Sequence, residues 1–241
     1  MFRSPRIISL VLLVLLCIPS SAFAQLVIAS GAGYRAVLNP VVKAYVQSGG
    51  EKPELVYGNM ARVTAQAKMS GAVDLVLGDK NFLKDSGLEF CREDSLGKGK
   101  LVAIYPKGKS FNGPQELALG FRKLAIPDPS RAIYGKAAKE YLENTGLLHK
   151  LGDRLIPVST VPQAAAYLLS GEVDVAFINL THALKLAPKI GGYAELNEKA
   201  YSPISIVLCE MADAPHKDEA TAFLAFVQTP EAQTIIHRFG L

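Results

Sequence analysis

One supersecondary unit occurs twice in this 241-residue chain, about 100 residues apart. Each copy is a strand, a polar turn and a helix, followed by Ser-Gly-x-Val-Asp and an apolar strand, at 70–77 and again at 170–177. A solenoid needs more than two units, so this duplication favours two similar α/β lobes. Strands that alternate with helices along the chain also predict mostly parallel sheets. In the alternative interpretation, Ser-Gly is only a helix stop that occurs twice by chance.

Residues 26–39 (LVIASGAGYRAVLN) combine an apolar strand, a tight glycine turn and the start of a helix. Gly31 and Gly33 allow the backbone to turn sharply and to approach a ligand closely. The helix that follows would point its free N–H groups, and the positive end of its dipole, at the turn. The stretch therefore predicts an anion site, and we expect several such turns to meet around one small anion.

The remaining elements follow from hydrophobic periodicity and turn composition. Strands are expected at 54–57, 101–105, 123–126, 155–158 and 204–208. Helices are expected at 60–70, 81–86, 133–144 and 161–170, with two more between 219 and 241. In the helix over 60–70, the spacing predicts that Val63, Ala67 and Met69 face the core.

The first 24 residues have the composition of a secretory signal peptide. Two arginines precede a nearly unbroken apolar run over 7–18, and Ala-Phe-Ala at 22–24 is a small-x-small cleavage site. The run is too short for a transmembrane span. A lipoprotein would need a small residue before Cys17, where Leu16 stands, so we expect export without lipidation and a mature chain that begins at Gln25.

Removal of this segment lowers the net charge from +4 to +2, because it contains two arginines and no acid. So mild a charge argues against a nucleic-acid partner and against a membrane partner.

Two cysteines remain in the mature chain, Cys91 and Cys209. An exported protein with an even number of cysteines can form a disulfide between them, and the alternative is two buried free thiols.

Signatures of enzymes are missing from the sequence. Gly31-x-Gly33-x-x-Ala36 formally matches the dinucleotide-binding pattern, but the second strand ends at 57–59 (Tyr-Gly-Asn) without the acid that would hold a ribose. Neither G-x-S-x-G nor H-E-x-x-H occurs, and the four histidines are scattered without metal-ligand spacing. We therefore expect no enzyme activity, no cofactor and no protein-coordinated metal.

Three arginines follow predicted turns. Arg35 follows the first glycine turn, Arg62 the turn at 58–59, and Arg131 the Pro-Asp-Pro-Ser turn at 127–130. If the turns converge, three cations surround one cleft and can steer an anion into it and bind it. In the alternative interpretation, each arginine is a solvated residue in the first turn of its helix.

Over essentially the whole mature chain, the sequence resembles the molybdate/tungstate-binding proteins of bacterial ABC importers, within the type II periplasmic binding proteins. The stretches that carry the resemblance are 28–32 (IASGA), 71–75 (GAVDL), 101–106 (LVAIYP), 124–129 (LAIPDP) with Gly135 and 138–140 (AKE), 160–164 (TVPQA) and 230–240. The resemblance implies an α/β fold of two similar lobes with mostly parallel sheets, joined by crossing hinge strands. By this analogy the first lobe comprises 25–104 and a return segment, 206–241, and the second lobe comprises 105–205.

The resemblance also implies a set of ligand-binding residues. Serine hydroxyls and N–H groups of the first two turns, backbone groups after the Asp-Pro turn, a valine N–H at a helix start and a tyrosine hydroxyl contact the ligand in relatives. By position these fall on Ala32 (with Ser30 and Tyr34 nearby), Asn59 next to Met60, Tyr134, Val161 and Asn179. Most hydroxyl positions are thus changed, while the turns that offer N–H groups remain.

The function that this resemblance implies is capture of a small oxyanion, with molybdate or tungstate first, between two closing lobes. We expect a periplasmic monomer that delivers the anion to an ABC permease in the inner membrane. The alternative is the same fold binding an organic carboxylate or sulfonate through Arg35, Arg62 or Arg131. A secreted enzyme is the least favoured hypothesis, because no nucleophile, base and orienting group stand out.

Overall fold

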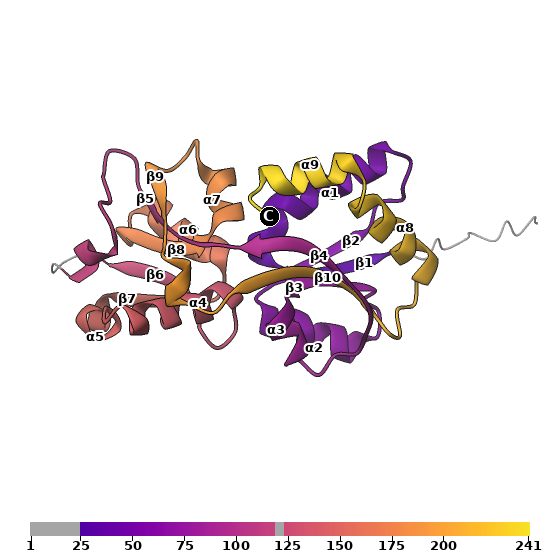
Figure 1. The fold of residues 1–241 in the computed structure, drawn as a ribbon, viewed down its shortest axis with the longest axis horizontal. Helices are drawn as coiled ribbons and strands as arrows, with labels where there is room; N and C mark the ends of the chain where they lie inside the picture. The colour runs from indigo at the N-terminus through magenta and orange to yellow at the C-terminus, as the bar shows by residue number, and fades with distance from the viewer. Residues whose placement is uncertain (1–24, 119–122) are drawn as a thin grey trace, which may run out of the picture.

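The computed structural model describes residues 25–118 and 123–241, and the predicted signal peptide over 1–24 lies outside the described residues. The described chain forms two α/β lobes that lie side by side along the long axis of the molecule (Figure 1). Each lobe is built on a five-stranded sheet in which three strands are parallel and two are antiparallel to their neighbours. The predicted fold class is therefore confirmed.

The two sheets have equivalent topologies. The order in the first sheet is β2 (Glu54–Gly58), β1 (Val27–Gly31), β3 (Leu75–Asp79), β10 (Ile204–Met211) and β4 (Phe90–Gly99). The order in the second sheet is β7 (Leu155–Val158), β6 (Leu124–Pro127), β8 (Val175–Asn179), β5 (Leu101–Tyr105) and β9 (Gly192–Glu195). In each sheet the first three strands are parallel, so their carboxyl ends meet at one edge, where ligands bind in open α/β sheets.

Helices cover both faces of each sheet. The first lobe carries α1 (Arg35–Gln47), α2 (Met60–Ser70), α3 (Lys80–Lys84), α8 (Lys217–Val227) and α9 (Pro230–Arg238). The second lobe carries α4 (Ile133–Asn144), α5 (Leu148–Leu151), α6 (Val161–Ser170) and α7 (Leu180–Leu186). The helices expected at 60–70, 133–144 and 161–170 have the expected bounds. β4, β9, α5 and α7 were not predicted from the sequence.

The prediction that Met69 faces the core is wrong. Val63 and Ala67 of α2 are buried, but the side chain of Met69 is 87% exposed. Two residues advance a helix by about 200°, so Met69 lies on the face opposite Ala67. The hydrophobic side chain at this position does not indicate burial.

The chain crosses between the lobes earlier than expected. The sequence analysis assigned 101–104 to the first lobe, but β5 pairs with β8 and β9 of the second sheet. The return segment likewise begins at Ile204 rather than at 206, because β10 belongs to the first sheet from its first residue. Only Lys100 separates β4 from β5, so no turn composition marks the crossing in the sequence.

The repeated Ser-Gly-x-Val-Asp motif has the same structural role in both lobes. Gly71 and Gly171 adopt left-handed conformations that end α2 and α6, with φ of 60° and 82°. Asp74 then accepts a hydrogen bond at 2.8 Å from the backbone N–H of Val27, at the start of β1. Asp174 accepts the equivalent bond at 2.8 Å from the N–H of Lys123, just before β6. Each aspartate therefore ties one strand of its lobe to the start of another.

The cysteines remain free thiols, so the possible Cys91–Cys209 disulfide is not formed. Cys209 is paired in the sheet with Glu93, and Cys91 lies at an irregularity in the register, with its thiol near the carbonyl oxygens of Glu210 and Met211. Cys91 is also exposed, which corrects the alternative of two buried thiols. Burial raises the pKa of the Cys209 thiol to about 12, so this thiol is unreactive.

The two aspartates of the repeat give a matched stability test. Asp74 is fully buried and also accepts hydrogen bonds from the backbone N–H of His216, at 2.8 Å, and from its Nδ1, at 2.9 Å. Asp74→Ala leaves three donors without an acceptor, so we expect a loss of about 3 kcal/mol or more in the free energy of unfolding. Asp174→Ala, which removes one such bond at a half-buried position, should cost about 1 kcal/mol. Urea denaturation checks both values, and equal losses would contradict the account.

Candidate anion-binding site

A small cavity lies between the lobes, at the carboxyl ends of the parallel strands. Its walls come from the glycine turn after β1, from the turn before α2, and from the first turns of α4 and α6. The lining residues are Gly31, Ala32, Gly33, Tyr34, Gly58, Asn59, Met60, Ala132, Ile133, Tyr134, Thr160 and Val161. The centre of a water molecule can occupy only about 20 Å³ of this cavity, which is space for about one or two waters. The cavity therefore suits a ligand of a few heavy atoms.

Three helices begin at this cavity. Met60, Ile133 and Val161 are the first residues of α2, α4 and α6, which have 11, 12 and 10 residues. Neither their backbone N–H groups nor that of Tyr134 donates to any acceptor within 25–118 and 123–241. Unpaired N–H groups and the positive ends of three helix dipoles thus meet at one point, which favours an anion.

Capping residues determine where these helices begin. The Asn59 side chain accepts a hydrogen bond from the N–H of Arg62 at 2.9 Å, and Thr160 accepts one from Gln163 at 3.3 Å. Before α4, Asp128 holds the turn by accepting two bonds from Ser130. These bonds lower the pKa of Asp128, with the Ser130 hydroxyl as the largest cause and the nearby Arg131 as a smaller one. The caps satisfy the third N–H of α2 and α6 and leave the first free for a ligand.

No charged side chain lines this cavity among the described residues. The polar side chains in its wall are Tyr34, Asn59, Tyr134 and Thr160. Burial foremost raises the pKa of both tyrosines, so both hydroxyls are neutral at any physiological pH. A dianion in this cavity would be held by neutral donors alone, which avoids burying a second ion beside it.

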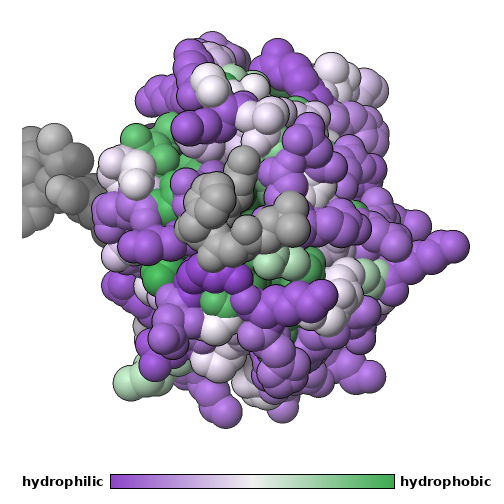
Figure 2. Space-filling view, turned by 90° about the vertical axis from the view of Figure 1, so that its left-hand side faces the viewer, coloured by the Kyte–Doolittle hydropathy of each residue, from purple (hydrophilic) through white to green (hydrophobic). Residues whose placement is uncertain are grey.

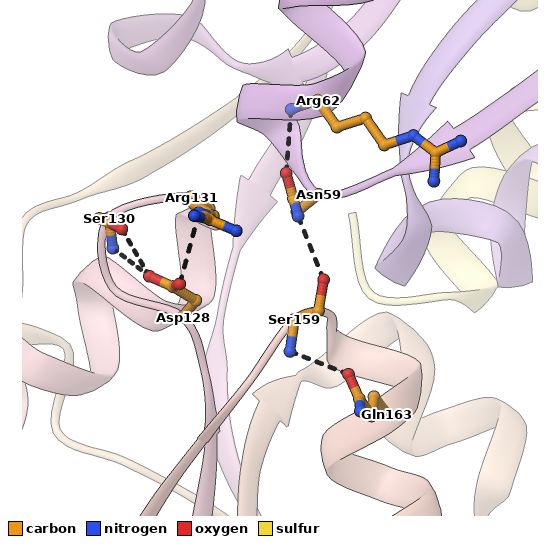
Figure 3. A network of polar contacts seen from close by, with 7 residues as sticks. All are labelled: Asn59, Arg62, Asp128, Ser130, Arg131, Ser159 and Gln163. Carbon is orange, nitrogen blue, oxygen red and sulfur yellow. Dashed lines mark hydrogen bonds and ion pairs between the residues drawn. The ribbon is translucent and has the colours of Figure 1, made fainter.

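The lobes touch directly around the cavity. The Tyr34 hydroxyl donates to the Tyr134 hydroxyl at 2.9 Å, and the N–H of Ala61 donates to the carbonyl of Arg131 at 3.1 Å. Figure 3 shows the third contact, in which the Asn59 amide of the first lobe donates to the Ser159 hydroxyl of the second lobe at 3.3 Å. The structure is therefore a closed arrangement of the two lobes.

Six of the eight positions inferred from the resemblance line the cavity: Ala32, Tyr34, Asn59, Met60, Tyr134 and Val161. Ser30 and Asn179 do not line it. Ser30 is buried and its hydroxyl donates to the adjacent carbonyl of Gly31 at 3.2 Å. Asn179 lies behind the glycine turn, where its amide donates to the carbonyl of Gly33 at 3.2 Å. Asn179 therefore joins the lobes rather than facing the cavity.

Four lining residues were not predicted as part of the site: Gly58, Ala132, Ile133 and Thr160. Gly31, Gly33 and Gly58 contribute backbone, and their position in the turns was the available signal. Thr160 was recognisable as a helix cap. The sequence gives no indication of a binding role for Ala132 and Ile133, because they contribute only apolar side chains and backbone atoms to the wall of the cavity.

The three arginines do not surround one cleft. Arg35 and Arg62 line a second, larger cavity next to the first, and Arg131 does not. Arg131 is exposed and pairs with Asp128 at 3.6 Å. In Figure 3 Arg62 and Arg131 lie on opposite sides of the Asn59–Ser159 contact, and the Arg62 side chain extends away from Arg131. The turns converge as expected, but the side chains that follow them diverge.

Two α/β lobes with this strand order, joined by crossing strands and closed over a small cavity, define a ligand-binding protein of the type II periplasmic class. The chain matches the bacterial extracellular solute-binding protein family over residues 26–241 and belongs to that family.

Similar proteins agree with this assignment. The chain is 27% identical over 195 residues, 76% of its length and 73% of the relative's, to a putative ABC transporter substrate-binding lipoprotein, YvgL, of Bacillus subtilis. It is 30% identical over 118 residues, 48% of its length and 46% of the relative's, to the molybdate-binding protein ModA of Rhodobacter capsulatus. The solved periplasmic molybdate-binding protein of Azotobacter vinelandii superimposes with a TM-score of 0.82 at 25% identity, covering 90% of this chain and 98% of that one. These relatives are solute-binding proteins, not enzymes.

Three further observations concern the described part of the chain. None of its helices is long and apolar enough to cross a membrane. No group of three or more His, Cys, Asp or Glu side chains within it could hold a metal ion. Figure 2 shows the end of the second lobe that lies farthest from the first lobe, where hydrophilic side chains predominate.

The tyrosine pair gives a test of lobe closure. Tyr134→Phe keeps the ring but leaves the buried Tyr34 hydroxyl without its partner across the lobes. The loss of one buried hydrogen bond is worth about 1 kcal/mol, so the affinity for the bound anion should fall by about fivefold. Isothermal titration calorimetry measures this change. Tyr193→Phe, on the exposed face of β9, is the control and should bind as the unaltered protein does. An unchanged affinity in Tyr134→Phe would show that the pair does not contribute to the bound state.

Proposed function

We propose that this protein captures a small tetrahedral oxyanion, molybdate or tungstate first, in the cavity between its lobes. It acts as a periplasmic monomer and delivers the anion to the permease of an ABC importer. The observation that carries the proposal is the convergence of three helix N-termini, with unpaired N–H groups, on a small cavity without a charged side chain.

The physical basis is electrostatic. A buried dianion loses the solvation of water, and fixed N–H dipoles replace it without any cost of reorganisation. Hydrogen bonds to an ionised group contribute about 1.5–3 kcal/mol each, so three or four of them supply a large part of the affinity. The size of the cavity then selects among oxyanions, because the donors themselves do not distinguish one tetrahedral dianion from another.

Closure links binding to transport. The anion contacts helix starts of both lobes, α2 from the first and α4 and α6 from the second, so it stabilises the closed arrangement over an open one. Relatives named as molybdate-binding support molybdate as the first anion to test.

A second candidate is an organic carboxylate or sulfonate. It rests on Arg35 and Arg62, which line the larger cavity beside the small one. An organic anion that depends on these cations should lose most of its affinity in Arg35→Ala or Arg62→Ala. An oxyanion held by backbone N–H groups should retain most of it.

A thermal-shift screen of ligand-stripped mature protein tests the proposal. The panel contains molybdate, tungstate, sulfate, phosphate, chromate and a set of small carboxylates and sulfonates. At a concentration 100 times the dissociation constant, a ligand adds about 2.7 kcal/mol to the stability of the native state, which raises the melting temperature by several degrees. We expect this shift with molybdate and tungstate. No shift with any oxyanion would contradict the proposal, and a shift with an organic anion alone would favour the second candidate.

The role of a single backbone N–H is testable at Val161. Proline is well tolerated at the first position of a helix, so Val161→Pro removes the N–H of this residue and preserves α6. The oxyanion should then bind about 10 to 100 times more weakly, as expected for one hydrogen bond to a charged group. Val161→Ala is the matched control, because it trims the side chain and keeps the N–H. Equal affinities of the two variants in calorimetric titrations would mean that this N–H does not hold the anion.

A further inference from the structure

A second cavity, which we call the basic vestibule, lies beside the small cavity and also spans the two lobes. It has a volume of about 440 Å³ and shares Ala32, Gly58, Asn59 and Thr160 with the small cavity. Its basic side chains come from both lobes. Arg35 and Arg62 extend from α1 and α2 of the first lobe, and His182 and Lys185 from α7 of the second lobe.

The cations of the basic vestibule are not neutralised by the protein. No Asp or Glu lines the vestibule, and Arg35, Arg62 and Lys185 form no ion pair within the part of the chain that the structure describes. Arg35 is instead held in place by the ring of Tyr57, with its guanidinium carbon 4.4 Å from the ring centre. Three uncompensated positive charges therefore surround one space, and this raises the local concentration of anions.

His182 is the fourth basic residue in the wall of the vestibule. Its side chain lines the basic vestibule and is about nine-tenths buried, yet its Nδ1 has no hydrogen-bond partner among the described residues. The Nδ1 atom is itself inaccessible, so it lies behind the wall of the vestibule and senses an anion there through charge rather than through a contact.

We propose that the basic vestibule is a second anion site, which binds multivalent oxyanions of phosphate or carboxylate chemistry that are too large for the small cavity. Arg35 and Arg62 contact such an anion from the first lobe, and Lys185 contacts it from the second. The anion lies against the wall that the two cavities share. The site does not depend on which oxyanion occupies the small cavity.

The vestibule also affects closure. Without an anion, the cations of the first lobe and Lys185 of the second repel each other across the gap when the lobes meet. A multivalent anion converts this repulsion into attraction to both lobes, so it should favour the closed arrangement and slow the release of the oxyanion behind it.

Calorimetric titration with inorganic pyrophosphate, and separately with citrate, tests the second site at constant ionic strength. We expect one site for either anion, both in stripped protein and in protein saturated with molybdate. The release of molybdate should be slower when pyrophosphate is present. Absence of pyrophosphate and citrate binding would overturn the proposal, and so would mutual displacement of pyrophosphate and molybdate, since it would indicate one shared site. Binding of pyrophosphate by a protein that fails to bind molybdate or tungstate would contradict the proposed function and leave the second site standing.

Substitutions test the position of the site. Lys185→Gln should weaken pyrophosphate binding by about tenfold or more, because it removes one charge-assisted contact. Without pyrophosphate it should not weaken molybdate binding, because Lys185 does not line the small cavity and its loss relieves the repulsion between the lobes. Lys189→Gln, an exposed lysine four residues further along and outside the vestibule, is the matched control. Equal weakening in the two variants would show a general charge effect and contradict a site.

The His182 ring gives a spectroscopic test. Burial foremost, and the charge of Lys185 second, lower the pKa of His182 to about 4. An anion bound among Lys185, Arg35 and Arg62 offsets these charges and favours the protonated ring, so pyrophosphate should raise this pKa. Titration of the ring resonances by NMR, with and without pyrophosphate, measures the change. An unchanged pKa under saturating pyrophosphate would place the anion outside the vestibule and overturn the proposal.

Discussion

Unpaired backbone N–H groups at the first turns of α2, α4 and α6 are the constraint on which the rest of the molecule depends. Each is a donor that the described chain leaves without an acceptor, and each lies at the positive end of a helix. One such helix start attracts an anion weakly. Three of them, which start at the same small cavity from two lobes, form a site that favours a negative ligand.

The two lobes are needed because neither one alone supplies the set. The first lobe contributes the glycine turn and the start of α2, and the second contributes the starts of α4 and α6. Direct bonds between the lobes, such as Tyr34 to Tyr134, are few and neutral, so they stabilise closure only modestly. In the proposed function, the anion completes the interface. Uncompensated cations beside the cavity add long-range attraction without entering the desolvated cavity itself.

The sequence predicted the fold well because its signals are local or duplicated. The repeated Ser-Gly-x-Val-Asp motif and the hydrophobic periodicity of each strand and helix report features of one lobe at a time. Features that depend on the meeting of the lobes could not be predicted in this way. Arg62 lies in the first turn of α2, whereas Arg131 lies in the turn before α4 and pairs with Asp128, so the two side chains diverge. The crossing at Lys100 carries no turn signal. The resemblance gave six residues that line the cavity. It also gave Ser30 and Asn179, which do not line it.

The measurement that tests the account most directly is a crystal structure of the protein with molybdate, with data collected at the molybdenum absorption edge. The anomalous signal locates the metal without any assumption about the ligand. The account predicts one strong peak in the small cavity, within hydrogen-bond reach, through its oxygens, of the N–H groups of Met60, Ile133 and Val161. A peak beside Arg35 and Arg62 alone, or no peak in a protein that crystallises closed, would contradict it.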